Sequence, residues 1–85
     1  MENVEKELSV GTLVDLLVRS LVDRPEEVLL TEIQGTQATV IEVKVAKTDH
    51  GKLVGRRGRT ADAIRDLLVT YGGKRNRRYM LEILE

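Results

Sequence analysis

Residues 39–46 alternate between two kinds of side chain, and this alternation constrains the fold more than any other feature of the chain. One side of the run carries Thr39, Ile41, Val43 and Val45, and the other carries Val40, Glu42 and Lys44. A period of two residues indicates a half-buried strand, whose apolar side needs a second layer to cover it. Residues 28–34 are also rich in β-forming residues, and Gly35-Thr36 between the two runs predicts an antiparallel hairpin.

The residues before this hairpin have helical spacing. Ser9 is suited to cap a helix over residues 10–22, and Pro25 ends it because the residue before a proline is pushed out of helical geometry. The apolar residues recur every three or four positions and are expected to form one buried stripe. This stripe consists of Val10, Leu13, Leu16, Leu17 and Leu21, and Val14, Val18 and Val22 widen it.

Two further helical segments follow the hairpin. A short turn is expected to run to Val54, with either Thr48 or Asp49 as its cap. A longer helix is expected over residues 59–71 and to end at Gly72-Gly73, because glycine readily adopts the left-handed conformation after a helix. The apolar residues that place this helix are Ala61, Ile64, Leu67, Leu68 and Tyr71.

A last alternating run, residues 78–84, predicts a third strand after the basic loop 74–77. The expected order is therefore α-β-β-α-α-β, an α+β fold. A strand that returns after two helices lies parallel to the strand before them if the two are neighbours. We expect a three-stranded mixed sheet with helices packed on one face, which buries all the apolar stripes in one core.

The charges of the chain are divided along its length. The formal net charge is zero, but residues 1–43 hold 3 basic and 9 acidic side chains, and residues 44–85 hold 11 and 5, which gives −6 and +6. A chain of this kind is able to present one basic face to a polyanion. The alternative is an evenly charged surface whose charges are merely ordered unevenly along the sequence.

The tetrapeptide Gly55-Arg56-Arg57-Gly58 joins the two helices of the basic half. Glycine permits a sharp turn and a close approach of another backbone, and the amides that start the next helix attract anions. The two arginines add fork-shaped donors suited to phosphate, and Lys52 and Arg59 extend the positive field. We predict a site for a sugar-phosphate backbone; the alternative is a helix–turn–helix corner with two solvated arginines, since Gly-x-x-Gly alone is common in turns.

Few residues suit catalysis or metal binding. The chain has no cysteine, which excludes a disulfide framework and a cysteine-ligated metal site. It has a single histidine, His50, which has no cysteine, second histidine or tight carboxylate cluster to act with in catalysis or metal binding. Asp62 and Asp66 lie one helical turn apart, but a helix-start position and a solvated position account for them better than a metal pair. We expect no enzyme activity, no cofactor, no metal ion and no small-molecule substrate.

The length and the ends of the chain give the expected organisation. A chain of 85 residues suits one domain, expected over residues 10–85 after a short acidic lead-in at 1–9. The acidic start does not have the pattern of a signal peptide, and there is no apolar run of about 18 residues to span a membrane. We therefore expect a cytoplasmic protein without a membrane partner.

Residues 41–84 resemble a KH domain, whose signature is an aliphatic pair, Gly-x-x-Gly and a following helix. Here the signature is Leu53-Val54-Gly55-Arg56-Arg57-Gly58-Arg59-Thr60. The α-β-β-α-α-β order is similar to the bacterial, type II arrangement. Residues 16–28, the run 51–55 and the ending 81–85 also resemble the KhpA family of small bacterial proteins with one KH domain, so the resemblance covers nearly the whole chain from about Val10.

The resemblance implies that the loop clamps about four nucleotides of single-stranded RNA through their backbone. The bases would lie in a shallow apolar groove formed by Val54, Ala61 and Ile64 of the helices, with a contribution from the neighbouring strands. A larger aliphatic residue is frequent in the family at the position of Ala61, so strong base preference is not expected. Lys74, Arg75, Arg77 and Arg78 form either a solvated turn or a track for the RNA strand that leaves the loop.

The family resemblance also implies protein partners. It points to a homodimer and to pairing with a larger KhpB-type KH protein, and a protein-interaction module is therefore the alternative to an RNA binder. At the cellular level it points to a bacterial post-transcriptional regulator, acting in RNA chaperoning or in the control of cell shape and division.

Overall fold

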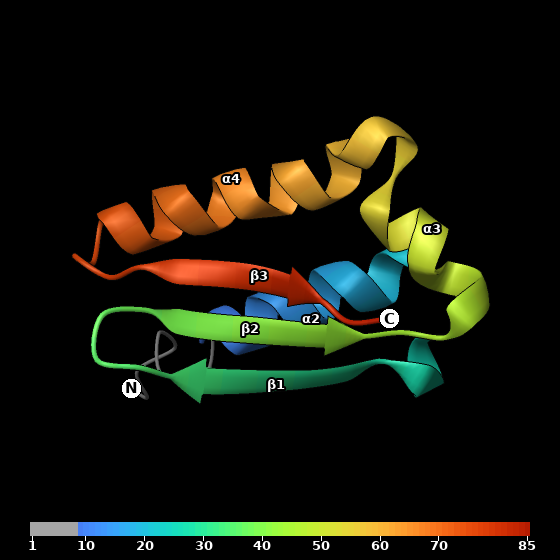
Figure 1. Cartoon of the computed structure of the whole chain (residues 1–85), viewed down its shortest axis with the longest axis horizontal. Helices are drawn as coiled ribbons and strands as arrows, with labels where there is room; N and C mark the ends of the chain where they lie inside the picture. The colour runs from blue at the N-terminus through green and yellow to red at the C-terminus, as the bar shows by residue number, and fades with distance from the viewer. Residues whose placement is uncertain (1–8) are drawn as a thin grey trace, which may run out of the picture.

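The computed structural model describes residues 9–85, so the expected acidic lead-in lies, except for Ser9, outside the described residues. The elements follow the predicted order (Figure 1). The helices are α2 (Val10–Leu21), α3 (His50–Val54) and α4 (Arg59–Gly73), and the strands are β1 (Leu29–Gln34), β2 (Thr39–Lys44) and β3 (Tyr79–Ile83). Short 3₁₀-helical turns occupy Pro25–Glu27, Lys47–Asp49 and Arg56–Gly58.

The three strands form one mixed sheet in the order β1-β2-β3, which confirms the predicted topology. β1 pairs antiparallel with β2, and β2 pairs parallel with β3. The alternation in β2 also has its predicted effect, because Thr39, Ile41 and Val43 are buried against the helical layer. Figure 1 shows α2 crossing behind the sheet and α4 running along β3, so the opposite face of the sheet is left open.

The buried face of α2 differs from the prediction. Val10, Val14 and Val18 face the core, with Val18 fully buried, whereas Leu13, Leu16 and Leu21 are 38%, 56% and 42% exposed. The leucines and valines both recur at helical spacing, so periodicity alone does not choose between them. The Glu32 side chain of β1 lies against Gly11, where a Cβ would meet its carboxylate.

The end of α4 also departs from the prediction. The helix includes Gly72 and Gly73, and neither has a positive φ; the left-handed residue is Asn76, with φ 53°. Gly72 is required for a different reason, because a Cβ at this position would meet the carbonyl oxygen of Arg77 and the ring of Tyr79. Glycine here permits the loop after the helix to fold back and start β3.

Neither Thr48 nor Asp49 caps α3, because its first turn has no side-chain cap. The Asp49 side chain is fully buried and faces the loop after α2 instead. Its carboxylate accepts hydrogen bonds from the backbone N–H groups of Asp23 at 3.0 Å and Arg24 at 2.9 Å. Asp49 therefore fastens the end of α2 to the start of α3.

Candidate functional site

The loop between α3 and α4 is a tight turn with unusual backbone angles. Gly55 has φ 81° and Gly58 has φ 75°, so both lie in the region that favours glycine. The N–H of Gly58 donates to the carbonyl oxygen of Gly55 at 3.0 Å, which closes the loop on itself. Gly55 is also short of space, since a Cβ there would meet the Thr60 side chain. Gly55 is therefore required by space and by its backbone angles, and Gly58 is favoured by its left-handed conformation.

Arg57 adopts a left-handed conformation as well, with φ 57° and ψ 26°. An L-residue in this region is strained by roughly 1–2 kcal/mol relative to the right-handed helical conformation. The turn nevertheless holds Arg56 and Arg57 exposed at the tip of the molecule, directly before the first amides of α4. The N–H of Arg59, the first residue of α4, donates to the carbonyl oxygen of Arg56, so the turn offers a ligand the two guanidinium groups and not this amide.

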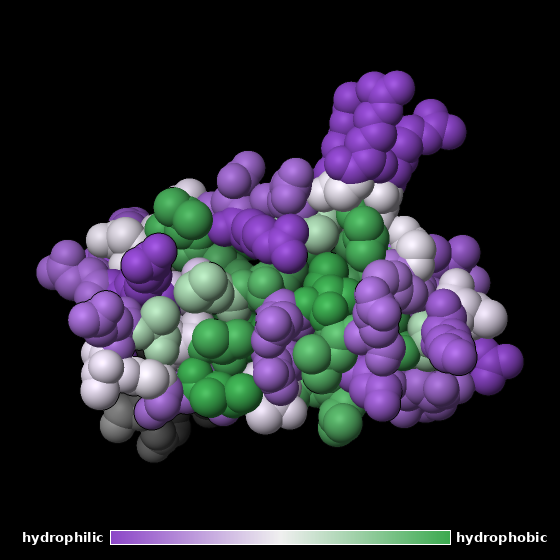
Figure 2. Space-filling model, in the orientation of Figure 1, coloured by the Kyte–Doolittle hydropathy of each residue, from purple (hydrophilic) through white to green (hydrophobic). Residues whose placement is uncertain are grey.

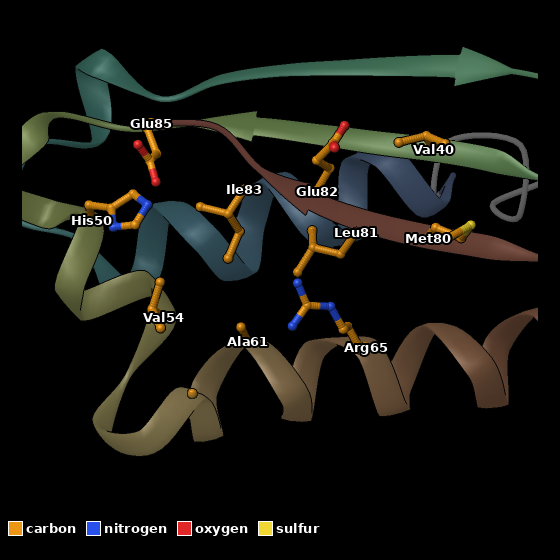
Figure 3. Close-up of a pocket in the computed structure, with 11 residues that line it drawn as sticks. Val40, His50, Val54, Ala61, Arg65, Met80, Leu81, Glu82, Ile83 and Glu85 are labelled. Carbon is orange, nitrogen blue, oxygen red and sulfur yellow. The ribbon is translucent and has the colours of Figure 1, made fainter.

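A groove of about 460 Å³ lies beside the loop, between α3 and α4 on one side and β3 on the other. Figure 3 shows its lining side chains, with Arg65 reaching from α4 toward β3 and with His50 and Glu85 at the opposite end. The α3–α4 side is formed by His50, Val54, Gly58, Ala61 and Arg65, and the sheet side by Val40, Met80, Leu81, Glu82, Ile83 and Glu85. The groove is thus apolar along its middle and charged at several points of its rim.

The predicted site residues are mostly brought together around this groove. Gly55, Arg56, Arg57 and Arg59 belong to the exposed loop region, and Val54, Gly58 and Ala61 line the groove. Lys52 lies on α3 and its Nζ is 3.4 Å from Oδ2 of Asp23, so part of its charge is already paired. Ile64 is not among the residues that line the groove: it is only 4% exposed and belongs to the core, where Leu81 of β3 also lies.

The expected contribution of the neighbouring strands comes mainly from β3, although the sequence did not indicate which strand residues line the groove, and Arg65 and His50 were not expected there. The β3 residues are more than twenty positions from the loop, and only the parallel pairing with β2 brings them to the groove. Arg65 follows Ala61 by four residues, and residues at this spacing share a face of a helix. This spacing could have indicated that Arg65 lines the groove beside Ala61. Its Nη1 also contacts Oδ1 of Asp62 at 3.3 Å, so Asp62 partners an arginine.

The groove continues past Arg65 toward the basic loop. A second hollow of about 450 Å³ shares Arg65, Met80 and Leu81 with the first and extends to Arg77 and Arg78. Arg75 has a structural role instead, because its guanidinium lies 3.9 Å from the ring centre of Tyr71, which packs edge-on against Tyr79. The basic cluster is therefore divided between packing and the end of the groove.

Residues 9–85 contain no group of three His, Cys, Asp or Glu side chains that is placed to hold a metal ion. Within the same residues, every helix is too short or too polar to cross a membrane.

Comparison with known proteins places these features in a family. A family model described as KhpA/KhpB, KH domain matches residues 12–83. The RNA-binding protein KhpA of Borreliella burgdorferi is 49% identical over 73 residues, which cover 86% of this chain and 89% of that protein. The same-named proteins of Chlamydia pneumoniae and Clostridium acetobutylicum are 51% and 42% identical, over 81% and 85% of this chain and 88% and 96% of theirs. No solved structure matched the chain.

Proposed function

Since the chain belongs to the KhpA/KhpB family of KH domains, we propose that it is a non-enzymatic protein that clamps single-stranded RNA between the Gly55–Gly58 loop and the groove beside it. The observation that carries the proposal is the loop itself. It holds two exposed arginines beside a groove that is apolar along its middle. Several relatives carry RNA-binding in their names, which supports RNA as the polyanion.

The proposed binding mode assigns different parts of the RNA to different parts of the site. Phosphates lie at the loop, where the Arg56 and Arg57 guanidinium groups donate to their oxygens and the positive end of the α4 dipole adds attraction. Bases lie in the groove against Val54, Ala61 and Ile83. The small Ala61 side chain provides limited apolar contact, so the backbone contributes most of the affinity and sequence preference is weak.

The affinity for RNA is expected to fall as the salt concentration rises, and the steepness of this fall gives the number of phosphates that the protein contacts. If the loop contacts about three phosphates of a single strand, a plot of log K against log salt has a slope of roughly −2. Fluorescence anisotropy with a labelled oligonucleotide of eight unpaired nucleotides, measured between 50 and 300 mM KCl, provides this slope. A slope near zero would contradict phosphate clamping, because binding through bases alone releases few counterions.

Arg57→Gly is expected to separate stability from binding. Glycine relieves the left-handed strain and raises the free energy of unfolding by up to about 1 kcal/mol, while removal of the guanidinium weakens RNA binding. Urea unfolding and anisotropy titrations on the same preparation measure the two effects. A variant that is destabilised, or that binds RNA as tightly as the wild type, would contradict the role given to Arg57.

A second function, as a protein-interaction module, is favoured by one observation. Leu13, Leu16 and Leu21 on α2 and Leu29 and Ile33 on β1 are exposed, and all five lie away from the groove. Leu29 and Ile33 lie on the open face of the sheet, whereas the three leucines of α2 recur at helical spacing and form one exposed stripe, which suits a homodimer or a complex with a KhpB-type protein. Light scattering after size exclusion at high micromolar concentration tests self-association, which is compatible with RNA binding. We place both functions in the cytoplasm, in post-transcriptional regulation or RNA chaperoning.

A further inference from the structure

The second hollow prolongs the groove along α4, beyond the part that the proposed RNA clamp uses. Its volume of about 450 Å³ is close to the 460 Å³ of the groove, and Arg65, Met80 and Leu81 line both. The wall that α4 provides follows four-residue steps, a spacing that places side chains on one ridge of a helix. This ridge consists of Ala61, Arg65, Val69 and Gly73. The second hollow is therefore a continuation of the groove and not a separate site.

The charges around the second hollow have one sign. Its lining, drawn from residues 9–85, holds Arg65, Arg77 and Arg78 and no acidic side chain, whereas Glu82 and Glu85 line the groove. Arg65 makes one exposed ion pair at 3.3 Å, which is weak in water. Arg77 and Arg78 are exposed, and their side chains make none of the ion pairs or hydrogen bonds found among residues 9–85. Three guanidinium groups are thus free to bind a polyanion.

The second hollow also has an apolar part that is open to solvent. Val69 of α4 and Met80 of β3 are 69% and 48% exposed, so packing in the core does not account for them. In Figure 3 Arg65 lies between Ala61 and Met80, and Figure 2 shows hydrophobic patches on this side of the molecule with hydrophilic side chains between them. Apolar surface with cations beside it suits a base that is flanked by phosphates.

The free edge of β3 offers polar groups to both hollows. The N–H of Thr39 donates to the carbonyl oxygen of Arg78 at 2.9 Å, which sets the phase of the β2–β3 ladder. Alternation from this bond directs the backbone groups of Tyr79, Leu81 and Ile83 away from β2. Ile83 lines the groove, Leu81 lines both hollows and Tyr79 lines the second. Residues two apart on a strand are about 6.6 Å apart, so this edge presents donors and acceptors at regular intervals past Arg78 and into the groove.

We propose that the second hollow is a further RNA subsite, which holds nucleotides of the same strand beyond the roughly four that the loop and the groove clamp. The inference rests on the proposed RNA binding and extends its footprint. Phosphates lie against Arg65, Arg77 and Arg78, and a base lies against Val69 and Met80. The basic loop before β3 thereby has two roles, since its Arg75 packs on Tyr71 while the next two arginines bind RNA.

The length of the second hollow sets the size of this footprint. α4 rises about 1.5 Å per residue, so its ridge spans roughly 10 Å from Gly58 to Arg65 and roughly 12 Å from Arg65 to Gly73. The two hollows therefore have similar lengths along the helix. A strand that fills both is expected to cover about seven or eight nucleotides, compared with about four for the loop and the groove alone.

Oligouridylates of four and eight nucleotides separate the two parts of the site. An eight-nucleotide strand offers five positions to a four-nucleotide site, which by mass action raises the apparent affinity about fivefold. With the second subsite we expect a gain of at least about 50-fold, and a slope of log K against log salt near −3.5 in place of −2, since about two further phosphates are contacted. Anisotropy titrations measure both quantities. A fivefold gain with equal slopes would overturn the second subsite and leave the clamp intact, whereas failure of both strands to bind would refute the clamp and the subsite with it.

Replacement of Arg77 and Arg78 by glutamine tests the assigned cations. We expect affinity for the eight-nucleotide strand to fall at least about tenfold and its salt slope to return to about −2, while affinity for the four-nucleotide strand changes less than about twofold. Lys44→Gln with Lys74→Gln is the matched control, because it makes the same change in net charge on exposed residues that line neither hollow. Equal losses in the two double variants would overturn the assignment.

Gly73→Glu tests the space in the second hollow without removing any contact. A Cβ at Gly73 would have no heavy atom within 4 Å, and its φ is not positive, so the midpoint of urea unfolding should be retained or raised. The new carboxylate lies where phosphates are proposed, so the ratio of eight- to four-nucleotide affinity should fall at least about tenfold. Gly51→Glu on α3 is the control, since it too has open space at its Cβ and lines neither hollow. A ratio that is the same in both variants would overturn the proposal.

Discussion

Simultaneous replacement of Arg56 and Arg57 by aspartate is expected to reduce RNA affinity at least about 100-fold, a loss of roughly 2.7 kcal/mol of binding free energy. The change removes two cations and adds two anions at the place where phosphates are proposed to lie, next to the amides that start α4. The fold should be unaffected, because both side chains are exposed. Neither takes part in any of the ion pairs found among residues 9–85. Aspartate is also among the residues that tolerate the left-handed conformation of Arg57.

The matched control is Lys44→Asp with Lys47→Asp, which makes the same change in net charge on exposed residues that do not line the groove. Anisotropy titrations at constant salt compare the two double variants with the wild type. The RNA affinity of the control is expected to fall less than about fivefold, since exposed charges more than a screening length from the RNA contribute little to binding. Equal losses for both would indicate attraction by the general field of the basic half, and wild-type affinity for the Arg56 and Arg57 variant would refute the assignment of the loop.

The fold was predictable where neighbouring residues alone decide the structure. The alternation of residues 39–46 and the helical spacing around Leu68 are local signals, and both have the expected structure. The parallel position of β3 followed from its connection through two helices. These elements needed no knowledge of any distant contact.

The predictions from the sequence were wrong where a contact with a distant part of the chain determines the structure. Valines rather than leucines of α2 are buried, and this follows from how the helix rotates onto the sheet, which helical spacing alone does not reveal. Gly72 is needed for the return of the backbone at Arg77 and not for a left-handed turn. In both cases the residue type agreed with a role that neighbouring residues define. The role in the structure depends instead on a contact with a distant part of the chain.

The site shows the same division. The residues of the loop are adjacent in sequence, so their types indicated a phosphate site before any geometry was known. The groove also needs β3, whose Met80 and Ile83 become part of it only through pairing with β2. Ile64 was assigned to the groove by family position, but its side of α4 faces the core. Local motifs thus identified the cationic end of the site, and the sheet determines the rest.

Asp49→Ala is expected to lower the free energy of unfolding by roughly 2 kcal/mol, because it leaves two partly buried backbone N–H groups without their acceptor. Small domains are stable by only about 5–15 kcal/mol, so this is a large fraction of the total. Asp49 is fully buried, and hydrogen bonds to a charged acceptor are about twice as strong as neutral ones. The loss is also expected to loosen α3, since the start of that helix is fastened to the loop after α2 at this point.

Urea unfolding followed by circular dichroism measures the effect, with Asp66→Ala as the control. Asp66 is exposed on α4, and its replacement should change stability by less than about 0.5 kcal/mol. The stability of Asp49→Asn should lie between those of Asp49→Ala and Asp66→Ala. The amide keeps one acceptor oxygen, but its NH₂ group faces the second N–H and cannot accept from it. If Asp49→Ala were as stable as the Asp66 variant, the buried carboxylate would not be what holds the entry to α3. The position of the Gly55–Gly58 loop would then depend on the apolar contacts of Leu53 alone, the one side chain of α3 that is buried in the core.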